Sequence, residues 1–172
     1  MPAVLREGHT PPPEQFLQQI WQFQRIRRSE IRTTDGRRIS VLHPGFMNLE
    51  AGPDFQQAYI QVGRAAPVEC DVEIDVASGG WQQHGHHTNP AFSGVGLHVV
   101  WQAGNGGPTG LPVVELKDQL DAPVGELSQS LGQANQLAAG TLGGTVYRTG
   151  LQAKQLAHAA PVRTAARAWP SG

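Results

Sequence analysis

The residues most able to do chemistry lie in an acidic segment that has the pattern of a β-strand. Apolar and acidic residues alternate through residues 68–76, which places Asp71, Glu73 and Asp75 on one face of the predicted strand. Asp54 begins the preceding predicted strand and could converge on the same face. Carboxylates on adjacent strands can hold Mg²⁺ or Mn²⁺ beside a phosphodiester. The alternative is the solvent-exposed face of an edge strand, which alternates in the same way.

Three histidines follow within one polar segment, residues 78–93. His84, His86 and His87 could supply imidazole ligands to Zn, Fe or Ni. Their spacing matches neither the HExxH pattern nor a zinc finger, and no cysteine lies among them. The alternative is that these side chains hydrogen-bond the backbone of the loop. We expect His98, inside a later apolar strand, to be a core histidine with a hydrogen-bond partner.

A basic segment precedes the acidic one. Six of the thirteen Lys and Arg residues lie between residues 25 and 38, whereas six of the fourteen acidic residues lie between residues 50 and 75. Arg25, Arg28 and Arg38 could contact phosphates without sequence specificity, which would make nucleic acid the partner. The alternative is a solvated surface that favours the end of the preceding helix. The net charge of −1 gives no global field that would draw the protein to nucleic acid or to a membrane.

The single cysteine, Cys70, excludes an internal disulfide framework and fits a reducing compartment. Its neighbour Asp71 disfavours the thiolate, so we do not expect a cysteine nucleophile. No apolar segment approaches the roughly 18 residues of a membrane-spanning helix, and no signal peptide is recognisable. We therefore expect a soluble, cytoplasmic protein without membrane contact. Nothing in the sequence indicates an oligomeric state.

Hydrophobic spacing predicts one helix followed by five strands. After three consecutive prolines, apolar residues recur at helical spacing through residues 14–28. The predicted strands are residues 38–42, 55–62, 68–76, 95–101 and 111–116. We therefore expect an α/β or α+β fold, in which the N-terminal helix packs on a small mixed sheet of about five strands. The glycine-rich segment 104–110 is expected to be a hairpin loop and not a phosphate-binding loop.

Composition divides the chain into three parts. Residues 1–13 are expected to be a flexible lead-in, and residues 14–121 are expected to form the α/β core domain. Residues 122–172 are rich in Ala, Gly, Gln and Leu and hold a single acidic residue, Glu126. Because glycines interrupt this last part, we expect a loosely ordered and only partly helical tail.

A series of short motifs, spread over about residues 14–117, resembles an uncharacterised bacterial family known as domain of unknown function 2851. The motifs are Pro44-Gly45, Asn48, Gly52-Pro53-Asp54-Phe55, Asp71-Val72-Glu73-Ile74, Trp81, His84, His86, Pro90 and Leu97-His98-Val99-Val100. The chain departs from the family pattern at Asp75, where the pattern has His, and at Gly80, where it has Asp. If the site needs those groups, it is impaired in this chain.

The layout of the family is similar to the PD-(D/E)XK nuclease-like core, which holds a divalent metal between an Asp on one strand and a Glu on the next. That similarity implies metal binding by Asp54 and Glu73. The leading hypothesis adds Asp71 as a further ligand, with Mg²⁺ or Mn²⁺ as the cofactor. The similarity also implies that position 75 is the basic residue of the motif, and here it is Asp. His84 or His86 would act as an acid, a base or a phosphate contact.

The leading hypothesis is therefore a metal-dependent phosphodiester hydrolase, with Asp54, Glu73, His84 and His86 as its catalytic residues. A second hypothesis is a catalytically silent binding or scaffold domain, in which the same polar residues only organise the loop. A third is a mononuclear His/carboxylate metal hydrolase built on His84, His86 and Glu73.

Overall fold

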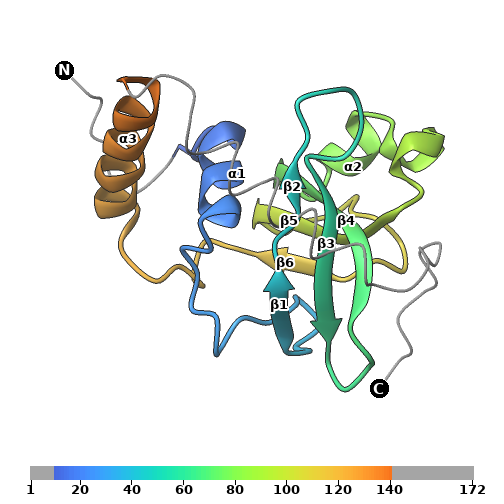
Figure 1. The fold of residues 1–172 in the computed structure, drawn as a ribbon. Coiled ribbons are helices and arrows are strands. Elements are labelled where there is room, and N and C mark those ends of the chain that lie inside the picture. Colours follow the sequence, from blue (N-terminus) through green and yellow to red (C-terminus); the bar gives the residue numbers. More distant parts are fainter. Residues whose placement is uncertain (1–9, 141–172) are drawn as a thin grey trace.

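The computed structural model describes residues 10–140. Most of the expected lead-in, and the part of the expected tail from residue 141 onward, lie outside the described residues. The described part contains a mixed sheet with helices packed on it, which confirms the expected α+β class (Figure 1). None of the helices in this part is both long and apolar enough to cross a membrane.

The sheet has six strands, one more than the sequence predicts. They are β1 (Ile39–His43), β2 (Phe46–Met47), β3 (Phe55–Val62), β4 (Val68–Ala77), β5 (Val95–Gln102) and β6 (Val113–Glu115). The order across the sheet is β1-β3-β4-β5-β6, and β2 pairs with β3. Strands β1, β3 and β4 are antiparallel, whereas β4, β5 and β6 are parallel. The two-residue strand β2 was not predicted, since two residues are too few to show alternation.

Helix α1 (Glu14–Gln22) begins directly after the prolines, as predicted. It buries the apolar stripe Phe16, Leu17, Ile20 and Trp21 against the sheet. The helix ends well before residue 28, because Gln24 adopts a left-handed backbone with φ 52° that cannot continue an α-helix. The indole N–H of Trp21 donates to the carbonyl of Pro44 at 2.9 Å and ties the helix to the end of β1.

A second long helix, α3 (Val124–Gly140), follows the last strand and lies beside α1 (Figure 1). It adds Leu127 and Leu131, both buried, to the main hydrophobic core. Its first part therefore stabilises the same core as α1, although the sequence predicts a core domain that ends at residue 121.

Replacing Leu127 by Ala is expected to lower the free energy of unfolding by about 2–5 kcal/mol, because a fully buried leucine leaves a cavity. Urea denaturation measures the change. Leu49→Ala is the matched control, since Leu49 is 83% exposed and its loss should cost little. Equal destabilisation by the two variants would mean that α3 does not dock on the core.

The acidic strand β4 lies in the middle of the sheet, between β3 and β5. Its side chains Asp71, Glu73 and Asp75 are all buried, so the interpretation of this face as a solvated edge is wrong. The reason is topological. A parallel connection must cross the sheet, and the segment between β4 and β5 passes over this face.

The glycine-rich segment 104–110 is not a hairpin loop, in contrast to the expectation from the sequence. It joins β5 to β6, and these two strands are parallel. The chain must therefore run back along the sheet before β6 begins, and Gly106 and Gly110 adopt positive φ angles on the way. Alternating sequence patterns on either side of a turn do not distinguish the two directions.

Candidate metal centre

The crossing segment between β4 and β5 is built from three short helical turns. They are α2 (Gly80–Gln83), the 3₁₀ turn η1 (His86–Thr88) and the 3₁₀ turn η2 (Pro90–Phe92). Trp81 and Phe92 are buried with Val95 in a small second core on this side of the sheet. This anchoring holds the histidines of the segment over the acidic face of β4.

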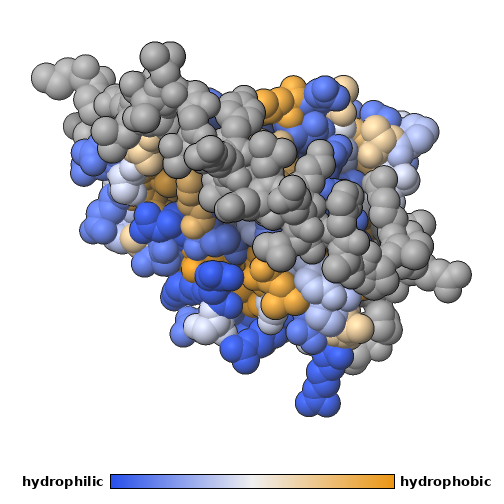
Figure 2. Space-filling view, viewed as in Figure 1, coloured by the Kyte–Doolittle hydropathy of each residue, from blue (hydrophilic) through white to orange (hydrophobic). Residues whose placement is uncertain are grey.

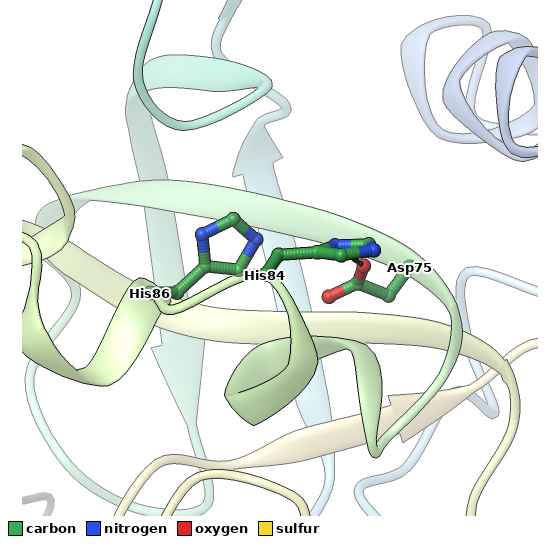
Figure 3. A group of neighbouring side chains, drawn as sticks. All are labelled: Asp75, His84 and His86. Atoms are coloured by element: carbon green, nitrogen blue, oxygen red, sulfur yellow. Dashed lines mark ion pairs between the residues drawn. The ribbon is translucent and has the colours of Figure 1, made fainter.

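Asp75 of β4 and two histidines of the crossing segment, His84 and His86, converge, as Figure 3 shows. One ligand atom from each of Asp75, His84 and His86 lies within 4.8 Å of the other two. Asp75 Oδ1 is 3.1 Å from His84 Nδ1. The side chain of Asp75 is 2% exposed, that of His86 is 10% exposed and that of His84 is 49% exposed. The cluster is thus closed at the sheet and open on the side of His84.

The imidazole of His86 lies among aromatic neighbours and contacts the carboxyl of Glu73. It stacks on Phe92 at a centroid distance of 3.9 Å and meets Trp81 edge-on at 5.5 Å. Its Nδ1 is buried without a hydrogen-bond partner, and its Nε2 lies 2.9 Å from Glu73 Oε1. Burial lowers the pKa of His86, which favours the neutral imidazole that metals bind. Buried polar atoms of this kind need a partner, and a cation would be one.

His98 fixes the carboxylate of Asp75 from behind. This histidine is fully buried in β5, and its Nε2 lies 2.8 Å from Asp75 Oδ2. The expectation of a core histidine with a hydrogen-bond partner is therefore confirmed. With Oδ2 held, Asp75 Oδ1 is left to face His84, in the way that outer partners orient metal ligands.

Gly80 leaves the space that the Asp75 carboxylate occupies. A Cβ atom at position 80 would lie 2.6 Å from Asp75 Cγ, closer than real Cβ contacts come. The buried aspartate on β4 and the glycine at the start of α2 therefore depend on each other. In this chain the carboxylate of the cluster comes from position 75 and none can come from position 80.

The carboxyl groups of Glu73 and Asp54 form a pair beside the cluster. Glu73 Oε2 accepts a hydrogen bond from the backbone N–H of Asp54 at 3.2 Å. Asp54 Oδ2 accepts one from the N–H of Ile74 at 2.9 Å, where β3 and β4 separate. Asp54 thus lies beside Glu73, as the sequence predicts, but each oxygen of its carboxylate already has a protein partner.

Burial, and after it the charge of Asp54, raises the pKa of Glu73 to about 9. Burial is also the main cause that raises the pKa of Asp54 to about 6, against the opposing effect of the Ile74 hydrogen bond. Within residues 10–140, no Lys or Arg forms an ion pair with Asp54, Glu73 or Asp75. Among the described residues, the only basic side chains that contact Glu73 and Asp75 are histidines, so a cation would meet carboxyls that no Lys or Arg neutralises.

Two residues of α1 join this region, and the sequence did not single them out. Gln18 donates from Nε2 to Asp54 Oδ1 at 2.9 Å and lies 3.4 Å from Glu14 Oε1. Burial, and then the charge of Asp75, raises the pKa of Glu14. The available signal was their spacing of four residues, which places both side chains on one face of the helix.

Asp71 and the arginines lie apart from the cluster. Asp71 lies two residues before Glu73 on β4. Its Oδ1 accepts a hydrogen bond from the N–H of Gln57 at 3.2 Å. The candidate phosphate contacts Arg25, Arg28 and Arg38 lie in or next to the loop from α1 to β1, whose surface is mostly hydrophilic (Figure 2).

Those three arginines make contacts within the protein. Arg25 forms an ion pair with Asp121 at 2.9 Å, and Arg28 donates to the carbonyl of Val41 at 3.2 Å. Arg38 donates to the carbonyl of Ser29. The structure does not bring them to the cluster, and a role in binding phosphate stays a prediction.

The comparison with protein families extends the resemblance seen in the sequence. The model of the family described as "Protein of unknown function (DUF2851)" matches residues 14–141, from the first residue of α1 to just past the end of α3. The chain belongs to the DUF2851 family. No curated protein and no solved structure matches this DUF2851 chain.

The cluster of this DUF2851 domain fits a divalent ion in its donor set. Ligands about 2.0–2.2 Å from a tetrahedral Zn²⁺ lie roughly 3–4 Å from one another, so a spacing within 4.8 Å needs only a small closure. The half-exposed His84 can supply that movement. Two imidazoles and one carboxylate with an open side are typical of sites that keep a coordination position for water or substrate.

Replacing Glu73 by Gln tests the electrostatics of the region. Because the folded protein raises the pKa of Glu73 from an ordinary value of 4.5 to about 9, the folded state binds more protons between those pH values. The contribution of Glu73 to stability should therefore fall as the pH rises from about 5 to 9. In metal-free protein, Glu73→Gln should raise the melting temperature at pH 8 and have little effect near pH 4.5. A stability difference that does not change with pH would contradict this account.

Proposed function

We propose that this protein is a divalent-metal-dependent hydrolase whose metal is held by Asp75, His84 and His86. The observation that carries the proposal is the buried imidazole of His86. Its Nδ1 is buried without a hydrogen-bond partner, its Nε2 lies 2.9 Å from Glu73 Oε1, and the ring supplies one of three ligand atoms that lie within 4.8 Å of one another. The proposal has two parts, which are metal binding by these residues and hydrolysis at the bound metal.

The donor set favours Zn²⁺ or Mn²⁺ over Mg²⁺. Mg²⁺ prefers oxygen ligands and retains much of its water, whereas imidazole nitrogens suit transition metals. The metal set therefore differs from the set of Asp54, Glu73 and Asp71 in the leading hypothesis from the sequence. It is closest to the mononuclear hypothesis, with Asp75 in the position that Glu73 was expected to take.

Hydrolysis is the reaction that suits a site of this composition. A bound divalent ion there would polarise a phosphoryl oxygen and activate a water molecule. Glu73, beside His86 and away from solvent, is placed to hold a proton next to the reacting atoms. Asp54 receives hydrogen bonds from Gln18 and Ile74 and supports Glu73 through its own backbone N–H.

Phosphodiesters are the proposed substrates because of the layout around these carboxyls. Asp54 follows Pro53 at the start of β3, and Glu73 lies on the neighbouring antiparallel strand β4. A helix precedes these strands, and a parallel strand follows them. This order is similar to the nuclease-like core, and the likeness supports the substrate class by analogy.

The test compares two histidines on the same loop. Chelated protein is assayed with Zn²⁺, Mn²⁺ and Mg²⁺ against bis(p-nitrophenyl) phosphate and single-stranded DNA and RNA. We expect Zn²⁺ or Mn²⁺ to restore hydrolysis, and His86→Ala to lower the rate at least about 100-fold. His87→Ala is the matched control, because His87 is exposed and outside the cluster. Equal rates for the two variants, or no hydrolysis with any of these metals, would refute the proposal.

A scaffold role is the second candidate, and one observation favours it. The carboxylate of Asp75 contacts His98 on β5 and His84 at the end of α2, and so ties the crossing segment to the sheet. In that case Zn²⁺ would raise the melting temperature without producing hydrolysis. The assay and a thermal shift measured on the same samples separate the two candidates.

A further inference from the structure

A cleft opens where the parallel strands β4 and β5 end. Its volume is about 610 Å³, within the range of cavities that hold small molecules. One wall is the end of β4 with the turn that follows it, residues 76–79. The other wall is the end of β5 with the start of the glycine-rich segment, residues 101–105. The carboxyl ends of parallel strands are where ligands bind in open α/β sheets.

The lining combines an aromatic surface with one positive charge. Trp101 and Val76 are partly buried residues of the cleft that also pack on the main core. Lys117 is exposed and is the only charged residue among the described residues that line the cleft. Asn105 and Gln102 add side-chain amides. An aromatic surface, amides and a cation together suit a planar base that carries a phosphate.

The cleft and the candidate metal centre both adjoin the end of β4 and the turn that follows it. Gly79 lines the cleft, and the next residue, Gly80, lies directly against the carboxylate of Asp75. Pro11, just before α1, also lines the cleft, and Glu14 at the start of α1 interacts electrostatically with Asp75 and His84. Asp75 and Val76 are consecutive residues of β4 whose side chains point to opposite faces of the sheet, so the cleft and the metal centre adjoin the same end of this strand.

The two walls of the cleft contact each other through Ser78 and the glycine-rich segment. Ser78 is buried, and its Oγ accepts a hydrogen bond from the N–H of Gly104 at 3.3 Å. A Cβ atom on Gly107 would lie 3.2 Å from Ser78 Cβ, so the absence of a side chain lets the glycine-rich segment approach the turn. Gly107 thus fits a close contact with the turn, which gives a role to part of a motif that the metal centre does not use.

We propose that the cleft binds the nucleotide next to the scissile phosphodiester, with the base at Trp101 and a phosphate at Lys117. This inference rests on the proposed function for the class of substrate. It adds a binding site outside the metal centre, and it predicts affinity for a nucleotide in the absence of metal.

The test titrates chelated full-length protein with adenosine 5′-monophosphate and follows the backbone amides by NMR. We expect the largest shifts at residues 76–79 and 101–105. Lys117→Glu should weaken binding at least about fivefold at low salt, through the lost and reversed charge. Arg64→Glu is the matched control, since Arg64 precedes β4 and lies roughly 30 Å along the strand from the cleft. Trp101→Leu keeps an apolar side chain and should weaken binding of the nucleotide more than binding of inorganic phosphate.

No binding of the nucleotide, shifts at other residues, or equal affinities of the Lys117 and Arg64 variants would overturn the inference. Binding is measured without metal and without turnover. A protein that fails to hydrolyse any phosphodiester would therefore refute the proposed function, while the nucleotide titration would still decide whether the cleft is a binding site.

Discussion

Gly80→Ala is expected to lower the affinity for Zn²⁺ or Mn²⁺ at least about 100-fold and to destabilise the protein by about 1–3 kcal/mol. The new Cβ would lie 2.6 Å from Asp75 Cγ, which is too close for both groups to keep their positions. Asp75 is enclosed by the sheet and held by His98, and Gly80 is fixed by the buried Trp81 that follows it. The carboxylate must therefore leave the position from which it meets His84 and His86.

The neighbouring glycine supplies the control for this experiment. A Cβ on Gly79 would meet only the carbonyl of Asn105 at 3.5 Å, which is an ordinary contact, and its backbone angles are helical. Gly79→Ala should therefore retain metal affinity and stability. Isothermal titration with Zn²⁺ and thermal denaturation measure both quantities for both variants. Unchanged affinity in Gly80→Ala would show that Asp75 does not hold the metal.

Asp75→Asn is expected to reduce metal affinity by a similar factor, at least about 100-fold, while the protein stays folded. Asparagine keeps the shape of the side chain and an oxygen that can accept from His98, but it removes the negative charge. The two imidazoles would then face the ion without a charged ligand. Activity, if the proposed hydrolysis holds, should fall with the affinity.

Asp71→Asn distinguishes the two possible metal sets. Asp71 lies on the same face of β4 and is buried to a similar degree, but it is not part of the three-residue cluster. We expect this variant to bind Zn²⁺ as the unchanged protein does. If Asp71→Asn loses the metal and Asp75→Asn retains it, the metal set of the leading hypothesis from the sequence is the better one.

Local patterns predicted most of the fold. The alternation of β4 and the apolar segment of β5 place both strands within a residue or two of their observed bounds. The end of α1 was not predictable from its apolar stripe, because one residue in a left-handed conformation, Gln24, stops the helix. The parallel direction of β6 was not predicted either. It depends on the path of the segment between β5 and β6, which packing sets and the pattern of β6 does not report.

The sequence predicted the location of the candidate site, but it did not predict which residues form the cluster. His84, His86 and the acidic strand were recognised from residue type and alternation. Asp75 was taken as a departure that would impair the site, because a motif gives the residue expected at a position and not the space around it. The space is what the glycine at position 80 provides. Gln18 joins through a contact with a residue 36 positions away, which no local pattern reports.

The most direct test of the account is anomalous diffraction from crystals soaked in Zn²⁺ or Mn²⁺. We predict one strong peak about 2.0–2.3 Å from Asp75 Oδ1 and from one ring nitrogen each of His84 and His86. A peak between Asp54 and Glu73 with no histidine ligand would contradict the account, and so would the absence of any peak at this cluster at saturating metal.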